Sequence, residues 1–212
     1  GRWLAPRLPG RKQWVLHDRD EELLAVAVAD PPGADVETRV TDVTQLGSNG
    51  LAGATLITAS ALLDLLTRDE LAALIESCAG AECPVLLTLS VTGHVKLHPA
   101  DPLDARLAAA FDAHQRRTTA RGRLLGPDAV SATVEGFREL GAEVVVAPSP
   151  WRLGPAERQL AAAWLAGWID AACEQTPGLA SEAELYRRRR VHQAHAGRLG
   201  VTVGHADLLV LP

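Results

Sequence analysis

The sequence predicts an α/β fold, in which short apolar strands alternate with helices around one core. Residues 13–29 contain an apolar run that is followed at once by a helical pattern. The spacing Thr67-x-x-Glu70 is a capping box, which predicts that a second helix begins there. This helix lies between two further apolar runs, at 54–59 and 84–89. Strands and helices that alternate in this way favour a parallel sheet with helices packed against it.

The first unit is predicted to be a strand at 13–17 and a helix at 20–29. Asp20 is placed as the N-cap, where a carboxylate oxygen can accept a hydrogen bond from a free N–H of the first turn. Asp18 stands at the carboxyl end of the strand, and ligands of open α/β sheets bind outside these strand ends. Asp18 is therefore a candidate to bind the two hydroxyls of a ribose. The alternative is that its side chain only stabilises the turn.

The remaining elements follow from apolar patterns and turn residues. Leu160, Trp164, Trp168 and Ala171 form one stripe of a predicted helix, which marks its buried face. In chain order, we predict the end of a helix at 2–8, a turn at 31–33, a strand at 36–40, a strand at 54–59 that is buried on both faces, a helix at 67–79, a buried strand at 84–89, an irregular polar loop at 90–102, helices at 104–117, 127–140, 155–175 and 181–196, and strands at 143–147 and 201–211.

Composition excludes several classes of protein. The 212 residues carry a net charge of -5, which argues against a general nucleic-acid binder. No apolar run approaches the ~20 residues that span a bilayer, and no signal-peptide pattern follows Gly1. The three cysteines, Cys78, Cys83 and Cys173, are too few and too irregularly spaced for a disulfide framework or a zinc site. We expect a cytoplasmic globular domain.

The order of these elements and several motifs resemble the class I S-adenosylmethionine-dependent methyltransferases. The motifs TASALLDLL, HPADPLDARLAAAFDAHQRRT, PSPWRLGPAERQLAAAWLAGW and VGHADLLVLP look like those of a largely uncharacterised bacterial subgroup. The resemblance implies a Rossmann-like sheet that is mostly parallel with one antiparallel strand and has helices on both faces. It also implies one methyltransferase-like domain over residues 1–212, with a helical insertion at 155–197 before the last strand.

The same resemblance implies S-adenosylmethionine as the cofactor. It would place Asp18 on the ribose, Asp42 and Val43 on the adenine, and Thr58, Ala59 and Ser60 beside the methionine part. The alternatives are that Asp42 only caps its loop and that Thr58 and Ser60 only cap a helix. The first strand and Gly-rich loop of the family would precede Gly1 and are absent from this sequence, so we expect the domain to be N-terminally incomplete.

The acceptor is predicted to be a small molecule, and its candidate ligands are Asp64, His94, His114 and Gln115. Asp64 and His114 could also act as a general base. His114 shares a helical face with Leu107 and Phe111 and could instead be a core histidine. Methyl transfer needs mainly proximity and alignment, because the sulfonium is already activated. The sequence therefore does not require a base.

Three other functions agree with parts of the sequence. A truncated or non-catalytic homologue would explain the absent Gly-rich loop. A nicotinamide-dependent dehydrogenase also places an acidic residue at a strand end. A metal hydrolase could use His94, His98 and Asp101, but Asp101-Pro102 is typical of a turn, and we predict no metal site. The four arginines at 187–190 are predicted to form a solvated helix face paired with glutamates.

Overall fold

The computed structural model describes residues 3–29 and 35–212, so the turn predicted at 31–33 lies outside the described residues. Its strands form three sheets. They are the pair β1 (Gln13–Asp18) and β2 (Asp35–Val40), the hairpin β5 (Thr118–Thr119) and β6 (Gly122–Arg123), and a five-stranded sheet made of β3 (Ile57–Ser60), β4 (Val85–His98), β9 (Gly200–Leu211), β7 (Glu143–Pro148) and β8 (Trp151–Leu153).

The α/β prediction is confirmed, but the five-stranded sheet is mixed. β3 runs parallel to β4, whereas β9 is antiparallel to β4, to β7 and to β8. The mostly parallel sheet predicted from the resemblance is therefore not reproduced in the pairings. The reason is that β9 comes after the other strands in sequence and enters between β4 and β7, where it opposes both neighbours.

Two of the predicted helix starts are confirmed by their caps. Oδ1 of Asp20 accepts hydrogen bonds from the N–H groups of Glu22 and Leu23, at 2.9 and 3.1 Å. The capping box of Thr67 and Glu70 is formed in both directions. The helices are α1 (Glu21–Ala29), α2 (Arg68–Ala79), α3 (Asp104–Gln115), α4 (Ala129–Glu139), α5 (Arg158–Gln175) and α6 (Ala180–His195), and the end of a helix predicted at 2–8 is a short 3-10 helix at Ala5–Arg7.

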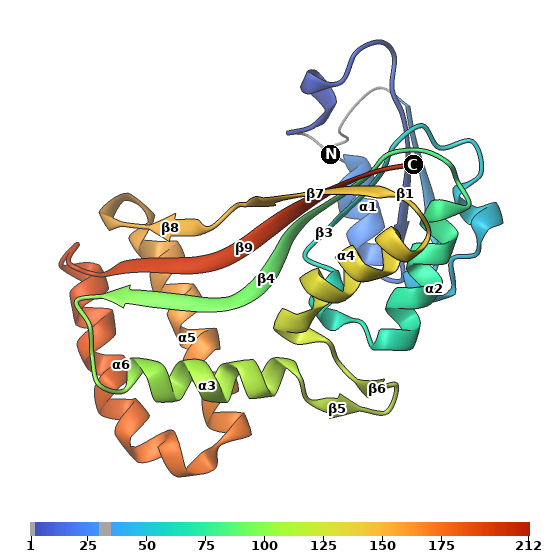
Figure 1. The fold of residues 1–212 in the computed structure, drawn as a ribbon. Coiled ribbons are helices and arrows are strands. Elements are labelled where there is room, and N and C mark those ends of the chain that lie inside the picture. The colour runs from blue at the N-terminus through green and yellow to red at the C-terminus, as the bar shows by residue number, and fades with distance from the viewer. Residues whose placement is uncertain (1–2, 30–34) are drawn as a thin grey trace.

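The loop predicted at 90–102 is wrong over most of its length. Residues 85–98 form one continuous strand, β4, which pairs along its length with β9. Val91, Val95 and Leu97 alternate with polar residues, and such alternation is typical of a strand with one buried face. β4 and β9 together connect the part of the molecule that contains α2 and α4 with the part that contains α3, α5 and α6 (Figure 1).

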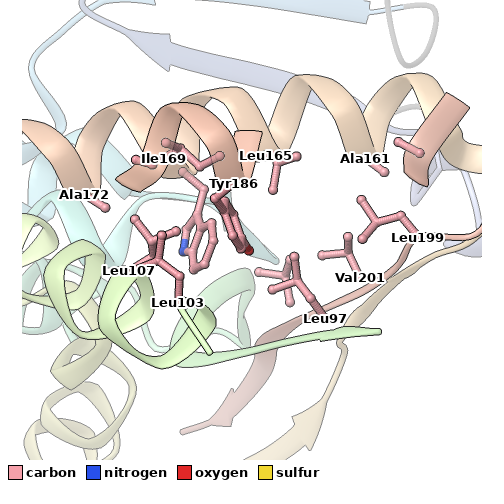
Figure 2. Packing of buried hydrophobic residues seen from close by; sticks show 14 of the residues in the cluster. Leu97, Leu103, Leu107, Ala161, Leu165, Ile169, Ala172, Tyr186, Leu199 and Val201 are labelled. Carbon is pink, nitrogen blue, oxygen red and sulfur yellow. The ribbon is translucent and has the colours of Figure 1, made fainter. Parts of the chain in front are cut away.

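The two parts have separate cores on opposite faces of β9. Leu208 and Val210 belong to the core built with α2 and α4, which we call the α2–α4 core. Val201 and Val203 belong to the core built with α3, α5 and α6, which we call the α3–α5–α6 core. Successive side chains of a strand point to opposite faces, so the even and odd positions of β9 serve different cores. Figure 2 shows the α3–α5–α6 core, where Leu165 and Ile169 of α5 face Leu107 of α3.

The buried face of α5 differs from the predicted stripe. The side chains that it buries are Ala161, Leu165, Trp168, Ile169 and Ala172, whereas Leu160 is 47% exposed. Trp164 is half-buried and stacks on Trp168 with the ring centroids 5.3 Å apart. The helix is therefore turned by about one residue relative to the prediction, because the small residues at 161 and 172 allow close contact with the rest of the core.

The structure also differs from the sequence predictions for β3 and for the start of α6. The strand predicted to be buried on both faces is β3, and Thr58 and Ser60 on one of its faces are exposed. The described helices cover only the other face, where Ile57 and Ala59 contact the α2–α4 core. The helix predicted at 181–196 is α6, which begins at Ala180 without a side-chain cap. No helix within 3–29 or 35–212 has the length and apolar character needed to cross a membrane.

Candidate functional site

The sheet bends where β3 ends, and Asp207 of β9 holds this bend. Its Oδ1 accepts a hydrogen bond from the N–H of Leu89 at 2.9 Å and another from the hydroxyl of Ser149 at 2.7 Å. Leu89 has a φ of 57°, which an L-residue adopts only with strain. A register shift between Leu87 and Ser90 accompanies it. Asp207 therefore compensates an irregular backbone at the point where β4 passes from one core to the other.

His205 lies two residues earlier on β9 and is 8% exposed. Its Nδ1 is 3.1 Å from the carbonyl oxygen of Val203. A carbonyl can only accept a hydrogen bond, so in the neutral ring Nδ1 carries the proton and Nε2 keeps a lone pair. The ring of Trp151 packs against it with the centroids 5.1 Å apart. Burial lowers the pKa of His205, while the Val203 carbonyl and the charges of Asp207 and Asp64 raise it in part.

Asp64 follows β3 on a single 3-10 turn, Leu63–Leu65, and is half-buried. Burial raises the pKa of Asp64, and the opposite charge of His205 limits the rise. Asp64 and His205 are thus within electrostatic reach of each other, and burial pushes each one toward its neutral form. A neutral imidazole with a free lone pair can accept a proton, and a nearby carboxylate stabilises the imidazolium that results. We call Asp64, Ser149, His205 and Asp207 the β9 polar cluster.

The two acidic residues at the ends of β1 and β2 both take part in their turns. Oδ1 of Asp18 accepts the N–H of Asp20 at 2.9 Å. Oδ1 of Asp42 accepts the N–H and the hydroxyl of Thr44, at 3.0 and 2.8 Å, and caps the 3-10 turn that begins at Val43. These bonds to Thr44 lower the pKa of Asp42. In each side chain, within the described residues, Oδ2 makes no hydrogen bond to protein.

Arg121 connects the neighbourhood of Asp42 with that of Asp64. Its guanidinium donates to Glu70 at 2.6 Å and to the carbonyl of Leu65, next to Asp64, at 3.3 Å. The same charge contributes to lowering the pKa of Asp42. Asp42 and the turn that carries Asp64 are therefore both within electrostatic reach of this guanidinium. Asp18 ends the strand beside Asp42, because β1 and β2 are parallel and Asp18 is in register with Val40.

The β3 residues predicted to line the cofactor divide between its two faces. Thr58 and Ser60 point to the exposed face, whereas Ala59 packs against the α2–α4 core. The hydroxyl of Thr88, on the neighbouring strand, is 3.5 Å from the carbonyl oxygen of Ala59. Polar side chains thus lie on the exposed face at the carboxyl end of β3, just before the turn that carries Asp64.

Three predicted acceptor ligands lie away from the β9 polar cluster. His94 is an exposed residue of β4 that lines a groove, which His205 also borders. Nε2 of His114 is 3.3 Å from a carboxylate oxygen of Glu174, so His114 faces α5. Oε1 of Gln115 is buried without a hydrogen-bond partner in the described residues. In the same part of the chain, no three His, Cys, Asp or Glu side chains are grouped closely enough to hold a metal ion.

His205, Ser149 and Asp207 were not predicted as candidate site residues. The segment GHADLLVLP was predicted as part of the last strand, and the structure confirms it as part of β9. The two polar residues in it, at 205 and 207, share one face of the strand because they are two positions apart. That spacing was the available signal. The hydrogen bond from Ser149 to Asp207 and the electrostatic influence of Asp64 on His205 depend on a register between segments more than 50 residues apart.

Comparison with solved structures shows an α/β fold like that of a methyltransferase structure. The chain is similar to a crystal structure of a "putative methyltransferase" from Bacillus halodurans C-125, with 16% identity and a TM-score of 0.52, over 98% of this chain and 84% of that one. At lower structural similarity, a mycolic acid cyclopropane synthase complexed with SAH and CTAB has 12% identity and a TM-score of 0.46, over 97% of this chain and 81% of that one.

A SAM-dependent methyltransferase from Geobacter sulfurreducens, in complex with S-adenosyl-L-homocysteine, is also similar. It has 14% identity and a TM-score of 0.38, over 98% of this chain and 87% of that one. The structure with a TM-score above 0.5 is that of the Bacillus halodurans protein, so at 16% identity the chain shares the fold of a protein described as a methyltransferase. No protein-family model matches the sequence, and no curated protein does.

Proposed function

We propose that this protein transfers a methyl group from S-adenosylmethionine to a small-molecule acceptor. The fold shared with the Bacillus halodurans protein supports the reaction class. The observation that carries the proposal is the pair of carboxylates at the carboxyl ends of two parallel strands, Asp18 and Asp42. Each uses Oδ1 for its own turn and keeps Oδ2 for a ligand.

The residues present fit the donor groups of this cofactor. A carboxylate oxygen accepts hydrogen bonds from ribose hydroxyls, so Asp18 would hold the ribose. Asp42 and the turn that begins at Val43 would hold the adenine. Thr58 and Ser60, which expose their hydroxyls at the end of β3, would lie with Ala59 beside the methionine part. The turn roles found for Asp18 and Asp42 are compatible with this assignment, because only one oxygen of each is occupied.

The acceptor would lie between the end of β3 and the β9 polar cluster. When bound, S-adenosylmethionine would supply an activated methyl group on a sulfonium, with a neutral thioether as the leaving group. The chain's own contribution is alignment of the acceptor and exclusion of water. For a hydroxyl or amine acceptor, Nε2 of His205 would take the proton that the acceptor loses, and Asp64 would stabilise the imidazolium. His114 is not used, because it pairs with Glu174.

We further propose that α5 and α6, within the predicted insertion at 155–197, shape the acceptor side of the site. They pack against the half of β9 that precedes His205. The half-buried ring of Trp151, which contacts this core, also contacts His205. Changes in the α3–α5–α6 core would therefore reach the acceptor through Trp151.

Calorimetric titration with S-adenosylmethionine tests the proposal. The protein should bind the cofactor, and Asp18→Ala should weaken binding by about tenfold or more, since a charge-assisted hydrogen bond contributes ~1.5–3 kcal/mol. Asp20→Ala is the matched control, because Asp20 is two residues away and caps α1 with its side chain. It should bind like wild type. Absence of binding by wild type, or equal binding by Asp18→Ala, would refute the assignment, and binding of a nicotinamide dinucleotide instead would favour a dehydrogenase.

A further inference from the structure

A groove of about 750 Å³ lies on the face of β4, β9 and β8 that is turned away from the α3–α5–α6 core. Leu97, Val201 and Leu153 are in register across the three strands and are buried in that core. Their neighbours one residue along each strand must point to the opposite face. These neighbours are Lys96, Thr202 and Arg152, and all three line the groove.

Lys96 and Arg152 lie on either side of Thr202. Lys96 is in register with Thr202 on one side, and Arg152 is in register with Thr202 on the other. Adjacent strands are ~4.8 Å apart, so the two long cationic side chains start about 10 Å from each other and can converge over the threonine hydroxyl. His94 and His98 of β4 add two imidazoles to the same lining.

The groove is positive although the whole chain has a net charge of -5. Its lining, among the residues that the structure describes, contains no Asp and no Glu. Lys96 and Arg152 are also absent from the ion pairs found in this part of the chain, in which nine arginines have a carboxylate partner. Two cations that flank one hydroxyl on a sheet, and that have no carboxylate partner among the described residues, are arranged to receive an anion.

Gly204 allows the side chains of β4 to lie across the floor of the groove. A Cβ at this position would be 2.4 Å from Oγ1 of Thr92 and 2.9 Å from Cβ of His94. A second glycine, Gly200, lies in register with His98. The space above Gly204 is thus filled by Thr92 and His94, whereas Gly200 leaves its part of the floor as bare backbone, where a ligand can approach closely.

We propose that this groove is a binding site for a small organic oxyanion with at least two negative charges, such as a diphosphate or a polycarboxylate. The planar guanidinium of Arg152 can bind two oxygens of one such group, while Lys96 and Thr202 contribute a point charge and a hydroxyl. The volume is that of a small-molecule site. A nucleic acid would need a longer run of cations than this row provides. His205 of the β9 polar cluster also lines the groove, so the anion site adjoins the proposed acceptor side. The proposal rests on Lys96, Arg152 and Thr202 and does not depend on methyl transfer.

Titration of the protein with inorganic pyrophosphate, and separately with citrate, tests the proposal by calorimetry and by amide chemical shifts. At least one of the two should bind, with shifts at Thr202 and its neighbours. Lys96→Gln or Arg152→Gln should weaken binding by about tenfold or more, because each removes one charge-assisted contact. Both side chains are exposed, so the variants should fold like wild type. The two titrations distinguish a phosphate from a carboxylate ligand.

Arg188→Gln is the matched control, since Arg188 is an exposed arginine on α6 that pairs with Glu184 outside the groove. It should leave pyrophosphate and citrate binding unchanged. The proposal is refuted if neither anion binds at millimolar concentration, or if Lys96→Gln and Arg152→Gln bind like Arg188→Gln. It is also refuted if a single-stranded oligonucleotide binds more tightly than both small anions through the same two residues.

Discussion

Arg190 of α6 and Asp104 of α3 form a buried ion pair, with Nη2 of Arg190 2.5 Å from Oδ1 of Asp104. The side chain of Arg190 is 1% exposed, although it belongs to a run of four arginines that the sequence suggested would be solvated. Its Nη1 donates to the carbonyl of Pro99 at 2.6 Å, and the hydroxyl of Tyr186 donates to the same carboxylate oxygen. The pair therefore joins α6 to the first turn of α3 and to the residues that follow β4.

Asp104→Ala should lower the free energy of unfolding by about 3 kcal/mol or more, because it leaves the charge of Arg190 buried without a partner. Urea denaturation measures this change. Glu184→Ala is the control, since it breaks the exposed pair with Arg188, and such pairs contribute about 0–1 kcal/mol. Equal losses in the two variants would contradict a structural role for the buried pair.

Gly204→Ala should destabilise the protein by about 1–3 kcal/mol, because the added methyl overlaps Thr92 and His94. Gly167→Ala provides the opposite case. A Cβ at Gly167 meets no atom within 4 Å, and the residue lies inside α5, where alanine is favoured by about 0.5–1 kcal/mol. Thermal or urea unfolding of the two variants should therefore shift in opposite directions, and shifts of the same sign would count against the contact across β4 and β9.

Asp64 should make stability depend on pH. Burial raises its pKa in the folded protein above the ordinary value of 3.8, so the folded state holds the proton more tightly than the unfolded state. As the pH rises from 3.8 through the folded-state pKa, the carboxyl ionises and the folded protein loses stability. Asp64→Asn should therefore be more stable than wild type at pH 7, and the difference should shrink as the pH falls toward 3.8. Unfolding curves at several pH values give this comparison; a difference that does not vary with pH would argue against the burial of Asp64.

The proximity of Asp64 and His205 can be measured by NMR titration of the histidine ring. Burial places the pKa of His205 below the ordinary 6.5, and the carboxylate of Asp64 raises it in part. Asp64→Asn removes that charge, so the pKa of His205 should fall further. Asp112→Asn is the control, because Asp112 is another carboxyl whose pKa is raised by burial but which does not act on His205. If both variants leave the His205 titration unchanged, the two residues do not interact.

Local signals in the sequence were sufficient to predict most helices. In the five-stranded sheet they were sufficient to predict β3, β7, β9 and the first half of β4. Asp20 and the Thr67–Glu70 box act within one turn, so their effect does not depend on the rest of the chain. The second half of β4 was missed, although Val91, Val95 and Leu97 alternate with polar residues. Its polar face is open to the groove, and its composition therefore resembles that of a loop.

Contacts between residues that are far apart in the chain could not be predicted from one sequence. Arg190 is buried because Asp104, 86 positions earlier, is brought next to it by the packing of α6 on α3. His205 acquires its place near Asp64 only through the register of β9 with β4 and β7. The acidic strand ends at Asp18 and Asp42 could be recognised because strand, acid and turn are consecutive. Their use of Oδ1 in the turn needed coordinates.

The position of β9 in the chain determines when each core can be completed during synthesis. β9 contributes Leu208 and Val210 to one core and Val201 and Val203 to the other, and it follows all of its partner strands in sequence. During synthesis on the ribosome, the edges that will pair with β9 therefore stay unpaired on β4, β7 and β8 until β9 has emerged. Edges of this kind invite pairing with other chains, so chaperone demand should be greatest in the interval before residue 200 leaves the exit tunnel.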